Sequence, residues 1–394
     1  MKKIWLKKGK DAAVKRFHPW VFSGAVGQRD DDLQDGDLVE VRSRQDQPLG
    51  FGHFQDGNIV VRMLSFSSEE VTPDFWKEKI LQAYRYREKL GLTHSEVTDC
   101  YRLIHASGDL MPGLIIDIYG RTAVIQCHSI GMHLVRQQLA DALLQVYGDH
   151  LQVIYDKSQK TLPTEYAAGM TDSYLYGAGN TTIVHEYGHQ FVVDCVSGQK
   201  TGFFLDQREN RHLLARYAPH KRVLNTFCYS GGFSVYALAA GATQVDSIDI
   251  SGSAVELTDQ NVALNNEQLQ SGRHRAIKAD VMKYLRDMEE QHDIIILDPP
   301  AFAKSKHKRH NAVQAYKRLN ALAISKLPPG GILFTFSCSN VVDRPLFRNT
   351  VVAAAMECGR QVRVMHELGQ PPDHPVNFFH PEGAYLKGLV LYVE

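Results

Sequence analysis

The chain has 394 residues, of which 44% are hydrophobic, and its 44 basic residues balance 44 acidic ones. This length predicts two or three globular domains, each with its own core. No apolar segment approaches the roughly 18 residues that cross a bilayer, and the N-terminus lacks the apolar core of a signal peptide. We therefore expect a cytoplasmic protein without a membrane partner. The zero net charge argues against a protein that binds nucleic acid by charge alone.

The cysteines are scattered along the chain without any C-x-x-C pair. This spacing indicates neither a zinc ribbon nor a disulfide framework, so we expect free thiols. The six are Cys100, Cys127, Cys195, Cys228, Cys338 and Cys358.

Residues 1–70 are predicted to form a small β-barrel-like module. The segments DLVEVRS, PLGFGHF and NIVVRMLS are apolar-rich and partly alternating, and Gly, Asp and Gln separate them. The start of the module is basic, with Asp11 as the one acid among Lys2, Lys3, Lys7, Lys8, Lys10, Lys15 and Arg16. Such a patch on a neutral protein is either the footprint of a phosphate backbone or a solvated surface.

Residues 71–190 are predicted to form a separate α+β unit. Apolar residues at helical spacing after a Thr-Pro start predict a helix over 73–90. The segment YRLIHASGDLMPGLIIDIYGRTAVIQC predicts a strand, a turn, and a hairpin around Tyr119 and Gly120. A second helix over 132–147 and a strand in QVIYDKS follow.

The segment His185-Glu186-Tyr187-Gly188-His189 matches the H-E-x-x-H motif of zinc proteases. That motif needs a helix, which brings both histidines to one face. The flanks TTIV and QFVVDC are β-rich and Gly188 suits a tight turn, so we expect a hairpin and no metal.

In residues 191–394, short β runs alternate with helices. The predicted strands lie in RVLNTF, QVDSIDI, IKAD, DIIILDPP and GILFTFSCS. This alternation predicts an α/β fold with a parallel, doubly wound sheet, whose ligands bind at the carboxyl ends of the strands. We therefore expect the chemistry in this part of the chain.

Three consecutive strand ends carry residues that suit a nucleoside cofactor. Gly231 and Gly232 let the backbone approach a ligand, although a plain turn would also explain them. Asp249 ends the next strand, where an acid can accept hydrogen bonds from both ribose hydroxyls. Asp280 follows one strand later and is placed to meet an adenine amino group. The spacing is not G-x-G-x-x-G, so no pyrophosphate is expected.

The segment ILDPPAF closes the fourth strand of this part. In one interpretation, Asp298 caps the following turn, and Pro299 and Pro300 only end the strand. In the other, the fixed φ angles of the two prolines hold Asp298 over a pocket for a flat base. In the second interpretation its carboxyl group binds the amidine edge of a cytosine.

Cys338 follows the next strand, in FTFSCSN. A buried structural thiol is the commoner role of a cysteine. Beside the Asp298 loop, however, a thiolate could attack C6 of a pyrimidine and turn C5 into a nucleophile that accepts a methyl group. Cations near the loop would lower the pKa of this thiol. The candidate cations form a cluster without acids: Lys304, Lys306, Lys308, Arg309, Lys317 and Arg318. Its first four members are also predicted to bind RNA phosphates. The alternative is that they form a solvated surface loop.

Seven motifs together resemble the bacterial large-subunit (23S) rRNA cytosine-5 methyltransferases of the RlmI type, nearly from end to end. They are HPWVFSGAV, YRLIHASGDLMPGLIIDIYG, GQKTGFFLDQREN, FCYSGGFSVYA, DPPAF, FSCS and DHPVNFFHPEGAYLKG. The resemblance implies an N-terminal PUA domain that binds RNA, a central α+β domain, and a C-terminal Rossmann-like class I methyltransferase domain that uses S-adenosylmethionine.

The resemblance also implies roles for single residues. Cys338 would be the nucleophile and Asp298 its catalytic partner. Many RNA cytosine-5 methyltransferases carry a second cysteine directly after the fourth-strand prolines, but Ala301 follows Pro300 here, so another base must release the enzyme. The cofactor site would be lined by Gly202, Phe203, Asp206, Arg208, Phe227, Tyr229, Gly231, Gly232, Asp249, Asp280 and Asp298.

The predicted function is S-adenosylmethionine-dependent formation of 5-methylcytosine in RNA, with large-subunit rRNA as the expected partner. Two alternatives stay open. The first is methylation of an exocyclic amine or a ring nitrogen, because Asp-Pro-Pro-aromatic also resembles the motif of N-methyltransferases, which need no thiol. The second is an RNA-binding assembly factor without catalysis, which would need none of the site residues. The sequence names neither the target nucleotide nor the oligomeric state, and a homodimer is left open.

Overall fold

The computed structural model describes residues 1–67, 71–269, 272–289, 291–303 and 305–394. These residues form two compact units. The first comprises Met1–Val184, Val193–Leu205 and Pro372–Gly383, and the second comprises His185–Val192, Asp206–Pro371 and Ala384–Glu394. None of the helices in the described ranges is long and apolar enough to cross a membrane.

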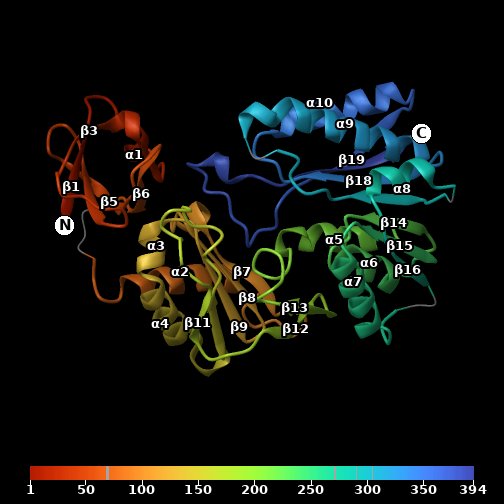
Figure 1. Cartoon of the computed structure of the whole chain (residues 1–394), viewed down its shortest axis with the longest axis horizontal. Helices are drawn as coiled ribbons and strands as arrows, with labels where there is room; N and C mark the ends of the chain where they lie inside the picture. The colour runs from red at the N-terminus through yellow and green to blue at the C-terminus, as the bar shows by residue number, and fades with distance from the viewer. Residues whose placement is uncertain (68–70, 270–271, 290, 304) are drawn as a thin grey trace. The chain divides into compact units, whose positions relative to one another are not determined.

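The N-terminal part of the first unit is a six-stranded sheet in the order β2-β6-β5-β4-β1-β3. Its core residues Ile4, Val39 and Val61 are inaccessible to solvent, as the alternation of apolar residues along the strands predicts. The predicted strands are confirmed; Figure 1 draws them in red. The elements are β1 (Lys2–Leu6), α1 (Ala12–Lys15), β2 (Trp20–Phe22), β3 (Val26–Arg29), β4 (Leu38–Arg42), β5 (Pro48–Phe54) and β6 (Ile59–Ser65).

The remainder of the first unit is built on a five-stranded sheet in the order β11-β10-β9-β8-β7. The predicted first helix and the hairpin are confirmed, but the predicted second helix is divided into two, because Val135 leaves helical geometry at φ −96° and ψ 8°. The elements are α2 (Phe75–Lys89), β7 (Cys100–His105), β8 (Leu114–Tyr119), β9 (Thr122–Cys127), α3 (Ile130–Leu134), α4 (Arg136–Tyr147), β10 (Val153–Asp156) and β11 (Ser173–Tyr176).

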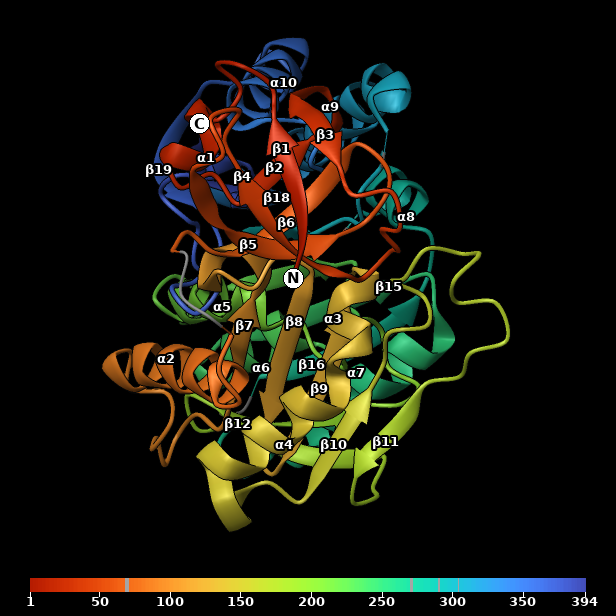
Figure 2. The same cartoon turned by 90° about the vertical axis from the view of Figure 1, so that its left-hand side faces the viewer.

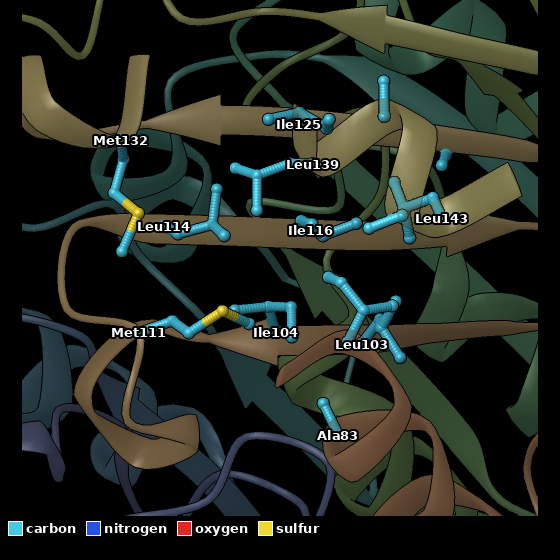
Figure 3. Close-up of a cluster of buried hydrophobic side chains, with 14 of the residues drawn as sticks. Ala83, Leu103, Ile104, Met111, Leu114, Ile116, Ile125, Met132, Leu139 and Leu143 are labelled. Atoms are coloured by element: carbon cyan, nitrogen blue, oxygen red, sulfur yellow. The ribbon is translucent and has the colours of Figure 1, made fainter. Parts of the chain in front are cut away.

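Helices α3 and α4 lie over one face of this five-stranded sheet (Figure 2). The side chains between the layers are aliphatic and fully buried, for example Ile116 on β8 and Leu139 and Leu143 on α4 (Figure 3). Burying each such side chain contributes roughly 1.5–3 kcal/mol to the free energy of unfolding. The packing of the two helices on the sheet therefore stabilises this part of the unit.

A two-stranded hairpin follows, made of β12 (Thr181–Glu186) and β13 (His189–Asp194). Its turn residues Tyr187 and Gly188 both have positive φ, 49° and 83°, as tight hairpin turns require. The predicted hairpin is confirmed. His185 and His189 therefore lie on strands and cannot share a helix face as the zinc-protease motif needs.

The second unit is built on a seven-stranded sheet in the order β16-β15-β14-β17-β18-β20-β19. The five predicted strands are confirmed and run parallel. Strands β19 and β20 were not predicted, and β20 is antiparallel to both of its neighbours. The strands are β14 (Arg222–Thr226), β15 (Gln244–Asp249), β16 (Arg273–Lys278), β17 (Ile294–Leu297), β18 (Gly331–Ser337), β19 (Val362–Leu368) and β20 (Lys387–Val393).

Helices cover both faces of this sheet, so the predicted doubly wound α/β fold is confirmed. One layer contains α8, α9 and α10, and the other contains α5, α6 and α7 (Figure 1). The helices are α5 (Arg208–Ala215), α6 (Gly232–Ala239), α7 (Gly252–Leu264), α8 (Val281–Asp287), α9 (Arg309–Lys326) and α10 (Arg344–Glu357). Strand β17 is fully buried, which accounts for its unbroken apolar sequence.

The strand register brings the candidate residues to one edge of the sheet. Leu297, the last residue of β17, pairs with Thr226 at the end of β14 and with Thr335 near the end of β18. Because β20 runs the other way, its first residue, Lys387, pairs with Ser337, the last residue of β18. A lysine from the C-terminal segment thus enters the edge at which the parallel strands end.

Candidate active site

The glycine turn after β14 has an unusual backbone. Phe227, Tyr229 and Gly231 all have positive φ, at 55°, 46° and 72°. A Cβ at Gly231 would lie 2.6 Å from Cγ2 of Thr258, and one at Gly232 would lie 2.8 Å from Cδ of Arg211. Packing within the protein therefore requires both glycines, in addition to any ligand. Left-handed backbone at two non-glycine residues is strained, and such strain is concentrated at functional sites.

Asp249 is fixed by the backbone around it. Its Oδ2 accepts a hydrogen bond from Tyr229 N at 3.2 Å, and its Oδ1 accepts one from Ser251 N at 2.9 Å. A carboxylate offers about four acceptor positions, so its remaining lone pairs can receive ribose hydroxyls. Asp280 is exposed and caps α8 by accepting from Lys283 N at 2.9 Å. This capping role was not foreseen, and the adenine contact stays a prediction.

Asp206 has an unused oxygen. Its Oδ2 accepts a hydrogen bond from the Tyr385 hydroxyl at 2.6 Å, while its buried Oδ1 has no hydrogen-bond partner in the described part of the chain. A buried acceptor without a partner is costly, so a ligand donor would stabilise it. The ammonium group of an amino-acid-bearing cofactor fits this requirement. Tyr385 belongs to the C-terminal motif, but no pattern in the sequence singled it out.

The other predicted residues of this segment are divided between the two units. Gly202 and Phe203 belong to the first, where Phe203 is buried and its N donates to the Tyr119 hydroxyl at 3.2 Å. Arg208 belongs to the second, is buried, and donates from Nε to Glu209 at 3.2 Å. Their part in cofactor binding stays a prediction.

Asp298 follows β17 at the strand edge. Burial raises the pKa of its carboxyl group to about 7, and the negative charge of Asp206 acts in the same direction. A hydrogen bond from the Gln207 side chain and the charge of Arg211 oppose these effects in part. The group can therefore both donate and accept a proton near neutral pH, as a residue that holds a nucleobase during proton movement should.

Cys338 is partly buried directly after β18. Burial, followed by the charges of Asp298 and Asp206, raises the pKa of its thiol to about 11. The expectation of a lowered pKa is therefore wrong. Lys308 and Arg309 are exposed, where solvent screens their charges, whereas Lys304 and the side chain of Lys306 lie outside the described residues. Among the cations that the structure describes, Lys387 acts on the thiol.

Lys387 is the functional candidate that sequence reasoning missed. Its side chain is buried, with 5% exposed, and its Nζ donates to the Ser339 carbonyl at 2.7 Å. The Ser339 hydroxyl in turn donates to the Ala303 carbonyl at 2.8 Å, which ties the Cys338 loop to the loop after Asp298. A signal was present in the sequence, because a charged residue opens the apolar run KGLVLYV.

Acids that are distant in the sequence form ion pairs with some lysines of the two basic clusters. Lys2 forms ion pairs with Asp32 and Asp37 at 3.1 and 3.0 Å, and Lys317 pairs with Glu357 at 2.6 Å. The predicted RNA contact at Lys304, and the side chain of Lys306, lie outside the described residues.

Glu186, from the zinc-like motif, is a structural residue. It is fully buried and accepts hydrogen bonds from Arg211 Nε and Nη2 at 2.8 and 2.7 Å and from the Tyr236 hydroxyl at 3.1 Å. Within the described ranges, the one group of three side chains with metal-ligand geometry contains neither histidine of that motif. It consists of His18, His380 and Glu382.

Two family models match the chain. One, described as S-adenosylmethionine-dependent methyltransferase, covers residues 145–390, and a PUA-like domain covers residues 4–66. The expected PUA-like module and methyltransferase domain are therefore confirmed, and S-adenosylmethionine is the cofactor. The buried, unpaired oxygen of Asp206 and the backbone-held Asp249 fit that molecule.

Relatives resemble the chain over its whole length. The protein named ribosomal RNA large subunit methyltransferase I from Pseudoalteromonas atlantica is 39% identical, with 99% of both chains covered. The protein of the same name from Aeromonas hydrophila is 38% identical, with 98% of both covered. A solved Streptococcus mutans protein described as a SAM-dependent methyltransferase has the same fold, with a TM-score of 0.83 at 24% identity and all of both chains covered. The chain therefore belongs to the S-adenosylmethionine-dependent methyltransferases, and within them to the family whose members are named ribosomal RNA large subunit methyltransferase I.

Proposed function

We propose that this enzyme methylates C5 of a cytosine in large-subunit rRNA, with Cys338 as the nucleophile. The relatives' name supports the RNA class. The observation that carries the C5 chemistry is the position of Cys338, a partly exposed thiol at the strand edge that is electrostatically coupled to Asp298. Methylation of an amine or a ring nitrogen would use Asp298 but would not require a thiol.

The proposed chemistry begins with a base that has left its stack, because neither group can reach a stacked cytosine. The Cys338 Sγ adds to C6 as a thiolate, and protonated Asp298 donates its proton at N3, so that the ring gains a bond without gaining charge. C5 is then nucleophilic. S-adenosylmethionine supplies the methyl group.

Release requires that the C5 proton pass to solvent water and that the C6–S bond break, which returns the thiolate. Asp298, ionised since the first step, takes back the N3 proton. The position that carries a second cysteine in many related enzymes is Ala301 here, so release does not use a second thiol.

Trapping the adduct tests this proposal. RNA that carries 5-fluorocytosine should remain covalently bound to Cys338, since fluorine cannot leave as the C5 proton does. Cys338→Ala should abolish both the adduct and methyl transfer to normal RNA, while its folding, RNA affinity and cofactor binding stay at the level of the unmodified enzyme.

Two cysteine variants serve as controls. Cys358→Ala, on the far end of α10, should keep full activity, and Cys228→Ala should keep the adduct even where the nearby glycine turn weakens cofactor binding. The adduct is mapped by mass spectrometry of the cross-linked peptide. An adduct on a different cysteine, or an active Cys338→Ala enzyme, would contradict C5 methylation and favour transfer to nitrogen.

A further inference from the structure

Lys387 has a distinctive position relative to Cys338. Its backbone pairs with Ser337, and its ammonium reaches the carbonyl of Ser339. Ser337 and Ser339 are the two neighbours of Cys338 in the chain. The lysine side chain therefore runs alongside the three-residue segment whose central member is the proposed nucleophile.

The charge of Lys387 lacks a carboxylate partner. An ammonium group has three donors, and in the described part of the chain the one hydrogen bond found for the Lys387 ammonium goes to the Ser339 carbonyl, with no ion pair to an acid. A buried charge without a counter-charge is unfavourable. Burial accordingly lowers the pKa of Lys387 to about 8, and a negative charge on Cys338 opposes that effect.

The other titratable groups near Cys338 and Lys387 differ in whether they favour or disfavour the charged forms of these two residues. Asp298 and Asp206 disfavour the Cys338 thiolate, and the ionisation of Tyr316 would do the same. Near Lys387, Asp343 favours the ammonium and Arg344 disfavours it. Within the described ranges, Lys387 is thus the cation that offsets the effect of these two carboxylates on Cys338.

We propose that Lys387 is a positioning residue that activates Cys338: its ammonium stabilises the thiolate, and its bond to Ser339 fixes the loop that carries the thiol. The inference rests on the proposed role of Cys338. In chemical terms, the reactive form is a minor population in which the thiol has lost its proton to solvent while the neighbouring ammonium keeps its own, and this thiolate–ammonium pair is neutral. RNA methylation then starts from a nucleophile that is already oriented.

The alternative role of Lys387 is purely structural, since the bond to Ser339 would hold the loop whatever the charge on sulfur. A measurement of thiol ionisation separates the two roles. We suggest iodoacetamide alkylation of Cys338 in the full-length enzyme without RNA or cofactor, followed peptide by peptide with mass spectrometry from pH 6.5 to 10. This assay needs no methyl transfer, so it gives a result even if the proposed function is wrong.

Lys387→Met should slow alkylation of Cys338 by about tenfold at pH 7, which corresponds to one pKa unit. The difference from the unmodified enzyme should shrink as the pH rises above 8, because Lys387 itself then loses its proton. A structural role would instead change the rate by the same factor at every pH. Lys326→Met is the matched control, since Lys326 also donates to a carbonyl, that of Met288 at 2.9 Å, and should leave Cys338 unaffected.

Lys387→Arg supplies the second arm. Arginine keeps its charge at every pH used, so at pH 9 this variant should be alkylated faster than the unmodified enzyme, in which Lys387 is mostly neutral. This prediction stands alone if Lys387→Met fails to fold. Equal pH profiles for the unmodified enzyme and Lys387→Arg, or a pH-independent effect of Lys387→Met, would overturn the inference. Failure of the proposed function is seen separately, as methyl transfer by Cys338→Ala.

Discussion

At the scale of single residues, the site combines an acid that is hard to ionise with a thiol that is hard to ionise. Asp298 and Cys338 each disfavour the negative charge of the other, and burial disfavours both charges. Near neutral pH the free enzyme therefore keeps the proton on almost every Cys338 thiol and on about half of the Asp298 carboxyl groups. This state suits an enzyme that should remain unreactive until a base is bound, because a neutral thiol reacts slowly with other electrophiles.

The raised pKa of Asp298 predicts a particular dependence of stability on pH. The folded-state pKa, about 7, lies above the usual value of 3.8, so the folded state binds more protons between these two pH values. The free energy of unfolding should therefore fall as the pH rises from 4 to 7 and stay level above 7. Three pKa units correspond to about 4 kcal/mol, and we expect about half, because Asp298 is only partly buried.

Urea unfolding at pH 5 and pH 8 measures this contribution. Asp298→Asn cannot titrate, so from pH 5 to pH 8 its stability should decrease less than that of the unmodified enzyme. Asp280→Asn is the control, because Asp280 is an exposed helix cap and asparagine caps equally well. If Asp298→Asn and the unmodified enzyme lose the same stability over this range, the carboxyl group is not protonated in the folded state.

At the scale of elements, the hairpin is joined to the methyltransferase fold through a buried ion pair. Glu186 on β12 bonds to Arg211 on α5 and to Tyr236 on α6, and both Glu186 and Arg211 are buried. Arg211 also packs against the glycine turn, where it leaves no space for a Cβ at Gly232. The pair thus connects the hairpin to the glycine turn that is predicted to bind the cofactor.

Breaking this pair should destabilise the enzyme strongly. Arg211→Met leaves the Glu186 carboxylate buried without its partner, which should cost about 3–5 kcal/mol of unfolding free energy. Replacing both residues, in Glu186→Gln/Arg211→Met, should recover a large part of that loss. The pair Arg348–Glu367 is the exposed control at 2.7 Å, and Arg348→Met should cost less than about 1 kcal/mol. Equal losses for the buried and exposed pairs in urea titrations would contradict this account.

Sequence reasoning found those elements whose evidence is local. The hairpin was predicted from β-rich flanks around Gly188, and five strands of the second unit from short apolar runs before turns. The break at Val135 was missed because the apolar spacing continues through it. The place of β20 between β18 and β19 was missed because an apolar run does not reveal which strand it will pair with or in which direction.

The candidate site shows the same limit. Asp249, Asp298 and Cys338 were predicted because each ends or directly follows its own strand. The charged start of KGLVLYV marks Lys387 as unusual, but its place beside Cys338 could not be predicted, since that depends on antiparallel pairing of Lys387 with Ser337, 50 residues earlier in the chain. The acids that neutralise Lys2 and Lys317 are likewise distant in sequence, so a count of nearby charges overestimated both basic clusters.

At the scale of the whole molecule, a neutral enzyme must bind a polyanion through local charge. At physiological ionic strength, charges act over about 8 Å, so the net charge of zero matters less than the cations at the point of contact. Lys308 and Arg309, at the start of α9, are exposed, and no ion pair to an acid is found for either in the part of the chain that the structure describes. They remain the best candidates for phosphate contacts near the proposed active site.

Removing these two charges should change the salt dependence of RNA binding. Each phosphate contact to single-stranded RNA contributes a slope of roughly −0.7 in a plot of log affinity against log salt. Lys308→Ala/Arg309→Ala should therefore make the slope less steep by about 1.4, and should lower the affinity for all RNA sequences alike. Binding of S-adenosylmethionine, measured by calorimetry, should not change.

Lys317→Ala is the matched control for this prediction. Lys317 lies on the same helix but is paired with Glu357, so its charge is already neutralised and its loss should change the slope by less than one phosphate contact would. Fluorescence anisotropy of labelled rRNA fragments at several salt concentrations gives all three slopes. If the double variant and Lys317→Ala both keep the slope of the unmodified enzyme, the start of α9 is a solvated surface and the phosphate contacts lie elsewhere. The exposed lysines Lys8 and Lys10 in the N-terminal module would then be the next pair to replace.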